Sequence, residues 1–185
     1  NGKQDQGVAL DITCEKFSSF EELKDWVSNS QLRVLALDGI TNPQNVGMII
    51  RSAVAGGVDA ILYPRKGVAT LGPLVIKASA GIVFKAPIIP CDELAPALSQ
   101  LQMAGAAIAT LEGNSDTSLF AYRPTNAVVY VLGGETHGVS SKVSGLADIK
   151  LHIPMGASVE SLNVAVAASL VAYSGYLAPS SSQHG

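Results

Sequence analysis

Aromatic residues, histidines and cysteines are all scarce in this sequence of 185 residues. Phe, Trp and Tyr make up only 5% of the chain, so few side chains are available to stack on the bases of a single-stranded nucleic acid. The three histidines, His137, His152 and His184, do not cluster in the sequence, and we expect no metal site. Cys14 and Cys91 are isolated, which is typical of reduced thiols in a cytoplasmic protein.

Long apolar runs and a strong charge of either sign are also missing. No uninterrupted apolar run approaches the roughly 18 residues of a membrane span, and the first five residues do not resemble a signal peptide. The net charge of −3 argues against bulk nucleic-acid binding. Five lysines and arginines nevertheless lie between Gly39 and Cys91 against the single acid Asp59, so a local anion-binding face is compatible with the sequence.

Apolar residues are abundant and arranged in alternating strand and helix patterns. They make up 48% of the chain and are mostly aliphatic, as in buried parallel sheets. A capping box starts a helix at Ser19, with Phe20, Leu23, Trp26 and Val27 on one face. We expect strands at 32–37, 58–63, 106–111, 127–132 and 149–152, an extended segment at 83–89, and helices at 45–55, 72–80, 92–103, 140–144 and 164–177.

This alternation predicts an α/β domain with a mostly parallel sheet flanked by helices. Residues 1–30 are expected to form an amino-terminal arm or linker with the leading helix. Residues 31–178 would form the domain, and residues 179–185 a flexible tail.

The stretch from Leu151 to Tyr173 is the most distinctive part of the chain. An apolar run ends at Met155, a glycine- and alanine-rich loop follows, and Ser161 and Asn163 open an apolar helix that we expect to be buried on most sides. Such a loop allows a ligand to lie against the backbone at a helix N-terminus. Ser and Asn at this place are equally good helix N-caps, so the residues alone leave both interpretations open.

Polar or glycine-rich loops follow several predicted strands, at 38–51, 112–114, 133–138 and 153–163. The carboxyl ends of parallel strands meet at one edge of a sheet, where ligands bind. Gly133-Gly134-Glu135 lacks the G-x-G-x-x-G spacing, which makes a nicotinamide-dependent enzyme improbable. From spacing alone, Glu135 also fits a solvated loop acid and Arg51 a surface arginine.

Three segments together resemble the motifs of the SpoU (TrmH-like) family of SPOUT RNA methyltransferases. Residues 45–51 match the first motif, N-x-G-x-x-x-R, and residues 132–138 resemble the second. Residues 153–155 with 161–167 resemble the third. Their order and separations make the resemblance specific, and it covers roughly residues 31–178. Thr136-His137 departs from the residues often found after the motif-two Glu.

The resemblance implies an α/β fold with a carboxyl-terminal deep trefoil knot that binds S-adenosyl-L-methionine. It also implies a homodimer that methylates a ribose 2′-hydroxyl of tRNA or rRNA. The catalytic residues implied are Arg51, Asn45, Glu135, Ser161 and Asn163. The cofactor contacts implied are Gly133, Ile153 and Leu162, with Thr110, Leu111, Gly113, Leu132, Gly134 and Met155 completing the pocket. Residues 6–9 resemble the junction after an amino-terminal substrate-binding domain of many relatives.

Two roles of Arg51 are weighed. The family arginine is usually drawn as the general base that accepts the 2′-hydroxyl proton. A neutral arginine near pH 7 would cost on the order of 7 kcal/mol. We therefore expect Arg51 to remain cationic and to act by positioning and electrostatics. Two alternative functions remain: a methyltransferase that acts on a base, and a catalytically silent RNA-binding or assembly factor. The sequence names neither the RNA nor the nucleotide.

Overall fold

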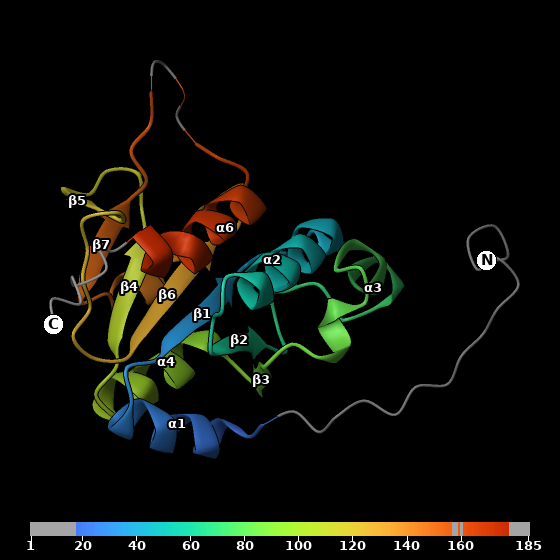
Figure 1. Ribbon diagram of the computed structural model, residues 1–185, viewed down its shortest axis with the longest axis horizontal. Helices are drawn as coiled ribbons and strands as arrows, with labels where there is room; N and C mark the ends of the chain where they lie inside the picture. The colour runs from blue at the N-terminus through green and yellow to red at the C-terminus, as the bar shows by residue number, and fades with distance from the viewer. Residues whose placement is uncertain (1–17, 157–158, 160, 178–185) are drawn as a thin grey trace, which may run out of the picture.

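A single parallel sheet forms the centre of the molecule (Figure 1). The computed structural model describes residues 18–156, 159 and 161–177. Within these residues, seven strands pair in the order β3-β2-β1-β6-β4-β7-β5, and each pairing is parallel. Their bounds are β1 Arg33–Asp38, β2 Ala60–Pro64, β3 Ile88–Cys91, β4 Ala107–Leu111, β5 Thr117–Ser118, β6 Val128–Gly133 and β7 Ile149–His152. The α/β prediction is confirmed, and the trefoil knot stays a prediction.

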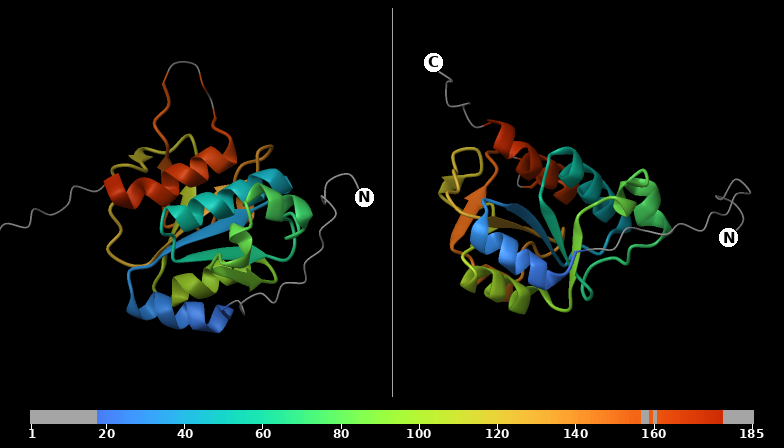
Figure 2. Two further views of the ribbon diagram at one scale, coloured as in Figure 1. Left: turned by 45° about the vertical axis from the view of Figure 1, so that its right-hand side comes forward. Right: turned by 60° about the horizontal axis from the view of Figure 1, so that its bottom comes forward.

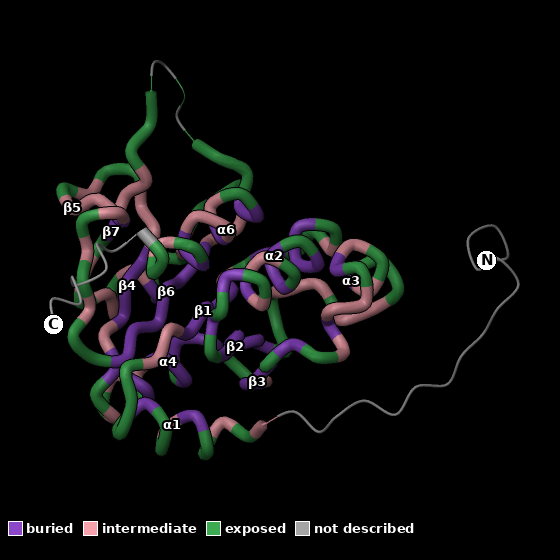
Figure 3. The backbone as a smooth tube through the Cα atoms, in the orientation of Figure 1, coloured by how far each residue is buried: buried purple, intermediate pink, exposed green. Residues whose placement is uncertain are grey.

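Helices cover both faces of this sheet (Figure 2). α2 (Pro43–Ala55), α3 (Pro73–Ala78) and α6 (Val164–Ser174) pack on one face, and α1 (Phe20–Asn29), α4 (Leu94–Met103) and α5 (Ser141–Ser144) on the other. Successive side chains of a strand point to opposite faces, so Leu35 packs under α2 while Val34 packs under α1 and α4. The central strands are buried throughout (Figure 3). This explains why their sequences are continuous apolar runs.

Helix α1 forms as its sequence predicts, with both capping-box hydrogen bonds between Ser19 and Glu22. Leu23 and Val27 are buried and join the core on the α4 side of the sheet. Trp26, expected on the same apolar face, is instead 41% exposed. The leading helix thus packs against the domain predicted for residues 31–178. Within the described part of the chain, no helix is long and apolar enough to cross a membrane.

Two local predictions were wrong. The segment 83–89 is not extended throughout, because Ile82–Phe84 forms a 3₁₀ helix (η1) before β3 begins at Ile88. Gly81 has φ +78°, and the buried Ser79 hydroxyl accepts a hydrogen bond from Val83 N at 3.4 Å, so the chain turns here. Strand β5 was not predicted, since two residues are too few to give a period-two pattern.

Helix α6 is buried on most sides and exposed on one. It buries Ala168 and Ala172 against α2, where Ser169 Oγ donates to Ser52 Oγ at 2.8 Å. A Cβ on Gly56 would lie 2.6 Å from the Cβ of Ala172, so the two helices approach closely. The opposite side leaves Val166 48% and Tyr173 46% exposed, and the other residues of α6 are buried or half-buried, so the helix is covered on most sides as predicted. A 3₁₀ turn, η2 (Gly175–Leu177), follows.

Candidate active site

Three of the five predicted catalytic residues are joined by hydrogen bonds at the carboxyl edge of the sheet. Asn163 Nδ2 donates to Asn45 Oδ1 at 3.2 Å, and Asn45 Nδ2 donates to Glu135 Oε1. Asn163 is also the N-cap of α6, and its Oδ1 accepts from Ala165 N at 2.9 Å. These hydrogen bonds between two amides and one carboxylate therefore connect the start of α6, the first turn of α2 and the loop after β6. We call Asn45, Glu135 and Asn163 the amide cluster.

Asn45 holds this cluster in one arrangement because its amide both donates and accepts. The side chain is only 5% exposed, and an Asn flipped by 180° would offer its oxygen to the Glu135 carboxylate. Asn45 lies in the first turn of α2, whose N-terminus favours a nearby carboxylate. The exposed Glu135 side chain is thus held at a defined place while it remains accessible to a ligand.

The loop that carries Glu135 depends on glycine. A Cβ at Gly133 would lie 2.0 Å from the carbonyl carbon of Gly138, and a Cβ at Gly134 would lie 2.4 Å from Gly39 O. Gly138 has φ +63°, and its N–H donates to Gly134 O at 2.9 Å, closing a tight loop. These three glycines fold the second motif back on itself.

A pocket of about 150 Å³ is lined in part by Ser161 and Leu162, which directly precede the cluster residue Asn163 in the chain. It is lined by Leu111, Glu112, Gly113, Leu151, His152, Ile153, Met155, Ser161, Leu162 and Ala167. Its walls are mainly aliphatic, and Glu112 and His152 supply its polar edge. The volume is below the roughly 300 Å³ of a typical ligand pocket. Residues 157, 158 and 160, in the loop between Met155 and Ser161, lie outside the described residues.

Some of the residues predicted to contact the cofactor line this pocket. Leu111, Gly113, Ile153, Met155 and Leu162 line it, together with the predicted catalytic residue Ser161. Thr110, Leu132, Gly133 and Gly134 do not: Thr110 is buried and hydrogen bonds to Glu112, and Leu132 belongs to the core. The sequence analysis missed Glu112, Leu151, His152 and Ala167. The alternation of side chains along β7 could have indicated His152, and the polar loop after β4 could have indicated Glu112.

Arg51 is not part of the amide cluster. It lies six residues beyond Asn45 on α2, which corresponds to about 9 Å along the helix axis and a rotation of about 240°. The side chain is exposed and has no polar partner among the described residues. Gly47 of the same motif has a packing role, because its Cβ would lie 2.5 Å from the Cβ of Ala78. The first motif thus has a structural glycine and a free cation as well as Asn45.

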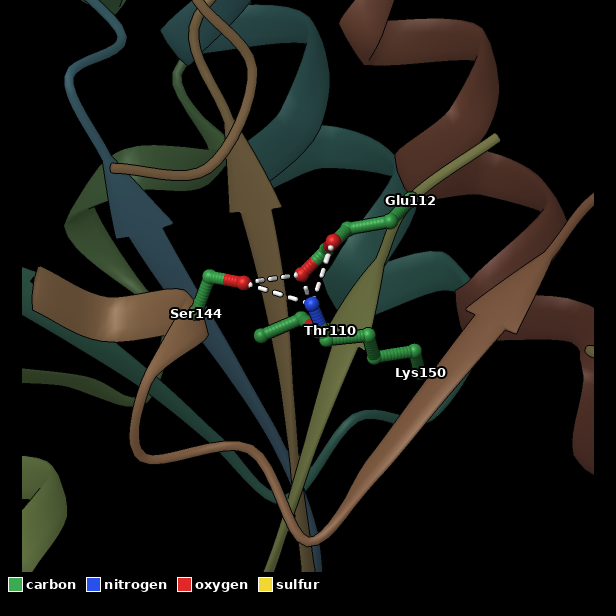
Figure 4. A network of polar contacts seen from close by, with 4 residues as sticks. All are labelled: Thr110, Glu112, Ser144 and Lys150. Atoms are coloured by element: carbon green, nitrogen blue, oxygen red, sulfur yellow. Dashed lines mark hydrogen bonds and ion pairs between the residues drawn. The ribbon is translucent and has the colours of Figure 1, made fainter. Parts of the chain in front are cut away.

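A second polar network includes the pocket residue Glu112 (Figure 4). Glu112 Oε1 accepts from Thr110 Oγ1 at 2.8 Å and from Ser144 Oγ at 2.7 Å, and Glu112 Oε2 accepts from Lys150 Nζ at 2.9 Å. Burial would raise the pKa of Glu112, but the hydrogen bonds from Lys150, Ser144 and Thr110 outweigh it and lower the pKa. Glu112 therefore remains ionised, and both of its oxygens are occupied.

The fold and this site together define an α/β domain with a small-molecule pocket beside a polar cluster at the carboxyl edge of a parallel sheet. No group of three potential metal-ligating side chains occurs in the residues that the structure describes. Residues 32–173 match the SpoU rRNA Methylase family, and the chain belongs to this family. The resemblance found in the three sequence motifs is thereby confirmed.

Individual relatives agree with this assignment. The chain is 37% identical over 174 residues to the 23S rRNA (guanosine-2′-O-)-methyltransferase RlmB of Xylella fastidiosa, covering 93% of this chain and 70% of that protein. The structure resembles the SpoU methyltransferase AviRb of Streptomyces viridochromogenes, solved with AdoMet, with a TM-score of 0.70 and 28% identity over 81% of this chain and 62% of that one. The AdoMet-bound rRNA methyltransferase of Sinorhizobium meliloti shares the fold, with a TM-score of 0.76 at 22% identity over 90% of this chain and 63% of that one.

Proposed function

We propose that the chain is the catalytic domain of an S-adenosyl-L-methionine-dependent RNA methyltransferase that modifies a ribose 2′-hydroxyl of rRNA or tRNA. The carrying observation is the contiguity of pocket and amide cluster. Ser161 lines the pocket, and Asn163, two residues later, belongs to the cluster. A methyl donor in the pocket would therefore lie beside ordered polar groups able to hold an acceptor. The names of the relatives support the same reaction.

The residues present fit the adenosyl part of this cofactor. Leu111, Ile153 and Leu162 give aliphatic walls suited to a flat ring, and Gly113 allows the backbone to come close. Glu112 and His152 line the same pocket and add polar groups to this aliphatic wall. When bound, the cofactor supplies an activated methyl group on a sulfonium. The chain supplies binding, orientation and exclusion of water.

The amide cluster and Arg51 would divide the work on the RNA. The cluster holds Glu135 and the α6 N-terminus in register, so that the ribose is presented at a fixed place. Arg51, exposed and without a partner among the described residues, would bind the adjacent phosphate and stabilise negative charge on the 2′-oxygen while remaining cationic. An Arg51→Lys variant with full activity and an acid-shifted pH profile would contradict this role and favour a general base.

The proposal includes a homodimer that buries the exposed side of α6. Val166, Tyr173 and Tyr176 are 48%, 46% and 66% exposed, and helical spacing places Val166 and Tyr173 on one side of α6. Exposed apolar side chains gathered on one side of a helix are typical of a protein interface. A cytoplasmic location also belongs to the proposal and rests on the RNA substrate.

Calorimetric titration with S-adenosylhomocysteine, the reaction product, tests the proposal without RNA. We expect micromolar binding that is lost in Leu162→Trp, which fills the pocket, and kept in the matched Met103→Trp, whose side chain is 81% exposed on α4. A folded protein that does not bind the ligand would contradict the enzymatic function and favour a silent RNA-binding factor. Nucleoside analysis of methylated RNA then distinguishes a ribose product from a base product.

A further inference from the structure

A second cavity, of about 470 Å³, lies at the amino edge of the sheet, opposite the candidate active site. Its walls come from the start of β1, the loop before β6, β6 itself, and the end of α6 with η2. The volume lies within the roughly 300–1,000 Å³ of typical ligand pockets. The three family motifs contribute no residue to this cavity, so the proposed function does not account for it.

Tyrosines gather around this cavity. Three of the five tyrosines of the chain, Tyr122, Tyr130 and Tyr176, line it, although aromatic residues make up only 5% of the sequence. The ring centroids of Tyr122 and Tyr130 lie 6.5 Å apart and the ring planes meet at 85°. Tyr122 is half-buried and Tyr130 is buried, so packing holds both rings in place. Rings held in this way stack on a flat ligand at little cost in conformational entropy.

Tyr130 adds a polar group to this aromatic wall. Burial raises the pKa of Tyr130 to about 12, so its hydroxyl stays protonated at neutral pH and can donate a hydrogen bond. Tyr176 also belongs to the exposed surface proposed for the dimer, whereas Tyr122 and Tyr130 do not. A ligand in the cavity therefore depends mainly on the latter two rings.

The charge of the cavity wall is positive. Two arginines and no aspartate or glutamate line it, although the chain as a whole has a net charge of −3. Arg33 is used by the fold, because its guanidinium donates to three backbone carbonyls. Arg123 is exposed and forms no ion pair among the described residues.

The Arg123 guanidinium is held in place while part of it stays available. Its Nη1 donates to Phe120 O at 2.8 Å and to Tyr122 O at 2.9 Å, and its Nη2 and Nε have no acceptor among the described residues. A guanidinium has five N–H donors in a planar arrangement that suits a phosphate. Arg123 thus presents a fixed cation beside the Tyr122 ring.

We propose that this cavity is a second ligand site, which binds a nucleotide with its base stacked on Tyr122 and its phosphate bound by Arg123. Aromatic stacking combined with an arginine is a usual way for proteins to hold nucleotides of a single strand. The site is separate from the candidate active site, since the six residues of β6 between the two edges span about 20 Å. A free nucleotide and a nucleotide within an RNA strand offer the same two groups.

Calorimetry with GMP and with guanosine tests the two contacts separately. We expect the wild type to bind GMP with a dissociation constant below about 1 mM, and guanosine about tenfold more weakly. Tyr122→Leu should weaken both ligands about tenfold, because both carry the base. Arg123→Gln should weaken GMP about tenfold and leave guanosine unchanged, because only GMP carries the phosphate.

Matched variants show whether these losses belong to the cavity. Tyr173→Leu and Arg65→Gln replace exposed residues that do not line it, and both should bind GMP as the wild type does. Absence of GMP binding to the wild type at millimolar concentration would overturn the proposal. A GMP affinity that falls in Arg51→Gln but not in Tyr122→Leu or Arg123→Gln would also overturn it, since GMP would then bind at the candidate active site.

Folding of the variants is checked by Tyr122→Phe and by the product of the proposed reaction. Tyr122→Phe keeps the ring and should bind GMP within about twofold of the wild type. A Phe variant that loses as much affinity as Tyr122→Leu would overturn the stacking contact. S-adenosylhomocysteine should bind Tyr122→Leu and Arg123→Gln as it binds the wild type. If it binds none of the three proteins while GMP binding behaves as expected, the proposed function fails and the second site stands.

Fluorescence anisotropy with a single-stranded oligoribonucleotide of about ten nucleotides identifies the source of the nucleotide. If the site holds RNA, Tyr122→Leu and Arg123→Gln should each bind the oligonucleotide about tenfold more weakly than the wild type. If it holds a free nucleotide, both variants should bind the oligonucleotide normally and GMP weakly. Wild-type affinity of both variants for GMP and for the oligonucleotide would overturn the proposal.

Discussion

The two edges of the parallel sheet differ in how they use polar side chains. At the amino edge, the Arg33 guanidinium donates to Ala172 O at 2.8 Å, Gly56 O at 3.0 Å and Gly57 O at 2.6 Å, joining the ends of α2 and α6. The exposed Arg51, farther along α2 than the amide cluster at the carboxyl edge, has no partner among the described residues. An arginine with three internal acceptors stabilises the fold, whereas polar groups without one are available to ligands.

Substitution of Arg51 is the strongest test of the contrast between a structural arginine and one that is available to ligands. We expect Arg51→Ala to lower kcat/KM for RNA methylation by about a hundredfold or more, because it removes a cation from the transition state. Its unfolding free energy should stay within about 0.5 kcal/mol of the wild type, since the side chain is exposed. Single-turnover kinetics and urea unfolding provide the two measurements. A destabilised but fully active variant would place Arg51 with the structural arginine.

Arg33 should show the reverse pattern. Arg33→Met keeps much of the aliphatic stem but removes three charge-assisted hydrogen bonds at two helix ends. We expect it to lower the unfolding free energy by about 3 kcal/mol, with affinity for S-adenosylhomocysteine unchanged in the folded fraction. Arg33→Lys is the matched control and should recover part of the loss. A stable variant with impaired ligand binding would remove the distinction between the edges.

The central strands and the candidate site differ in how well the sequence predicts them. Burial leaves a local pattern in the sequence, whereas contacts between distant loops do not. The central strands are buried on both faces, and apolar runs such as 127–132 therefore predicted them within a residue. The motif segments located Asn45, Glu135 and Asn163, but their hydrogen-bonded chain depends on three loops meeting in space. Arg33 was missed because its acceptors are backbone carbonyls far along the chain. Glu112 and His152 were missed because cross-strand register, rather than spacing, places them at the pocket.

The exposed side of α6 gives a third, intermediate effect. We expect Val166→Glu to shift the protein from dimer toward monomer, because it places a charge in the proposed interface. The free energy of association should become less favourable by about 2 kcal/mol. Sedimentation velocity over a concentration series measures this. Met103→Glu is the control, since Met103 is 81% exposed on α4, and it should leave the association state unchanged. Monomeric wild-type protein would contradict the interface.

Glu112 offers the smallest effect and tests whether a polar group at the carboxyl edge can also stabilise the fold. Its pKa is lowered in the folded protein, where Lys150, Ser144 and Thr110 outweigh the effect of burial. Its stabilising contribution is therefore complete above the unfolded pKa of about 4.3 and is lost as the pH falls through the lower folded pKa. Glu112→Gln should cost about 1 kcal/mol at pH 7, and the difference from the wild type should shrink below about pH 4.

Urea unfolding of both proteins from pH 7 down to pH 3 measures this difference, and Glu93→Gln is the matched control. Glu93 pairs only with Lys66 at 3.2 Å, and its side chain is 52% exposed, so solvent screening should leave its substitution nearly neutral at every pH. A pH-independent loss in Glu112→Gln would mean that shape and packing, not charge, hold this carboxylate.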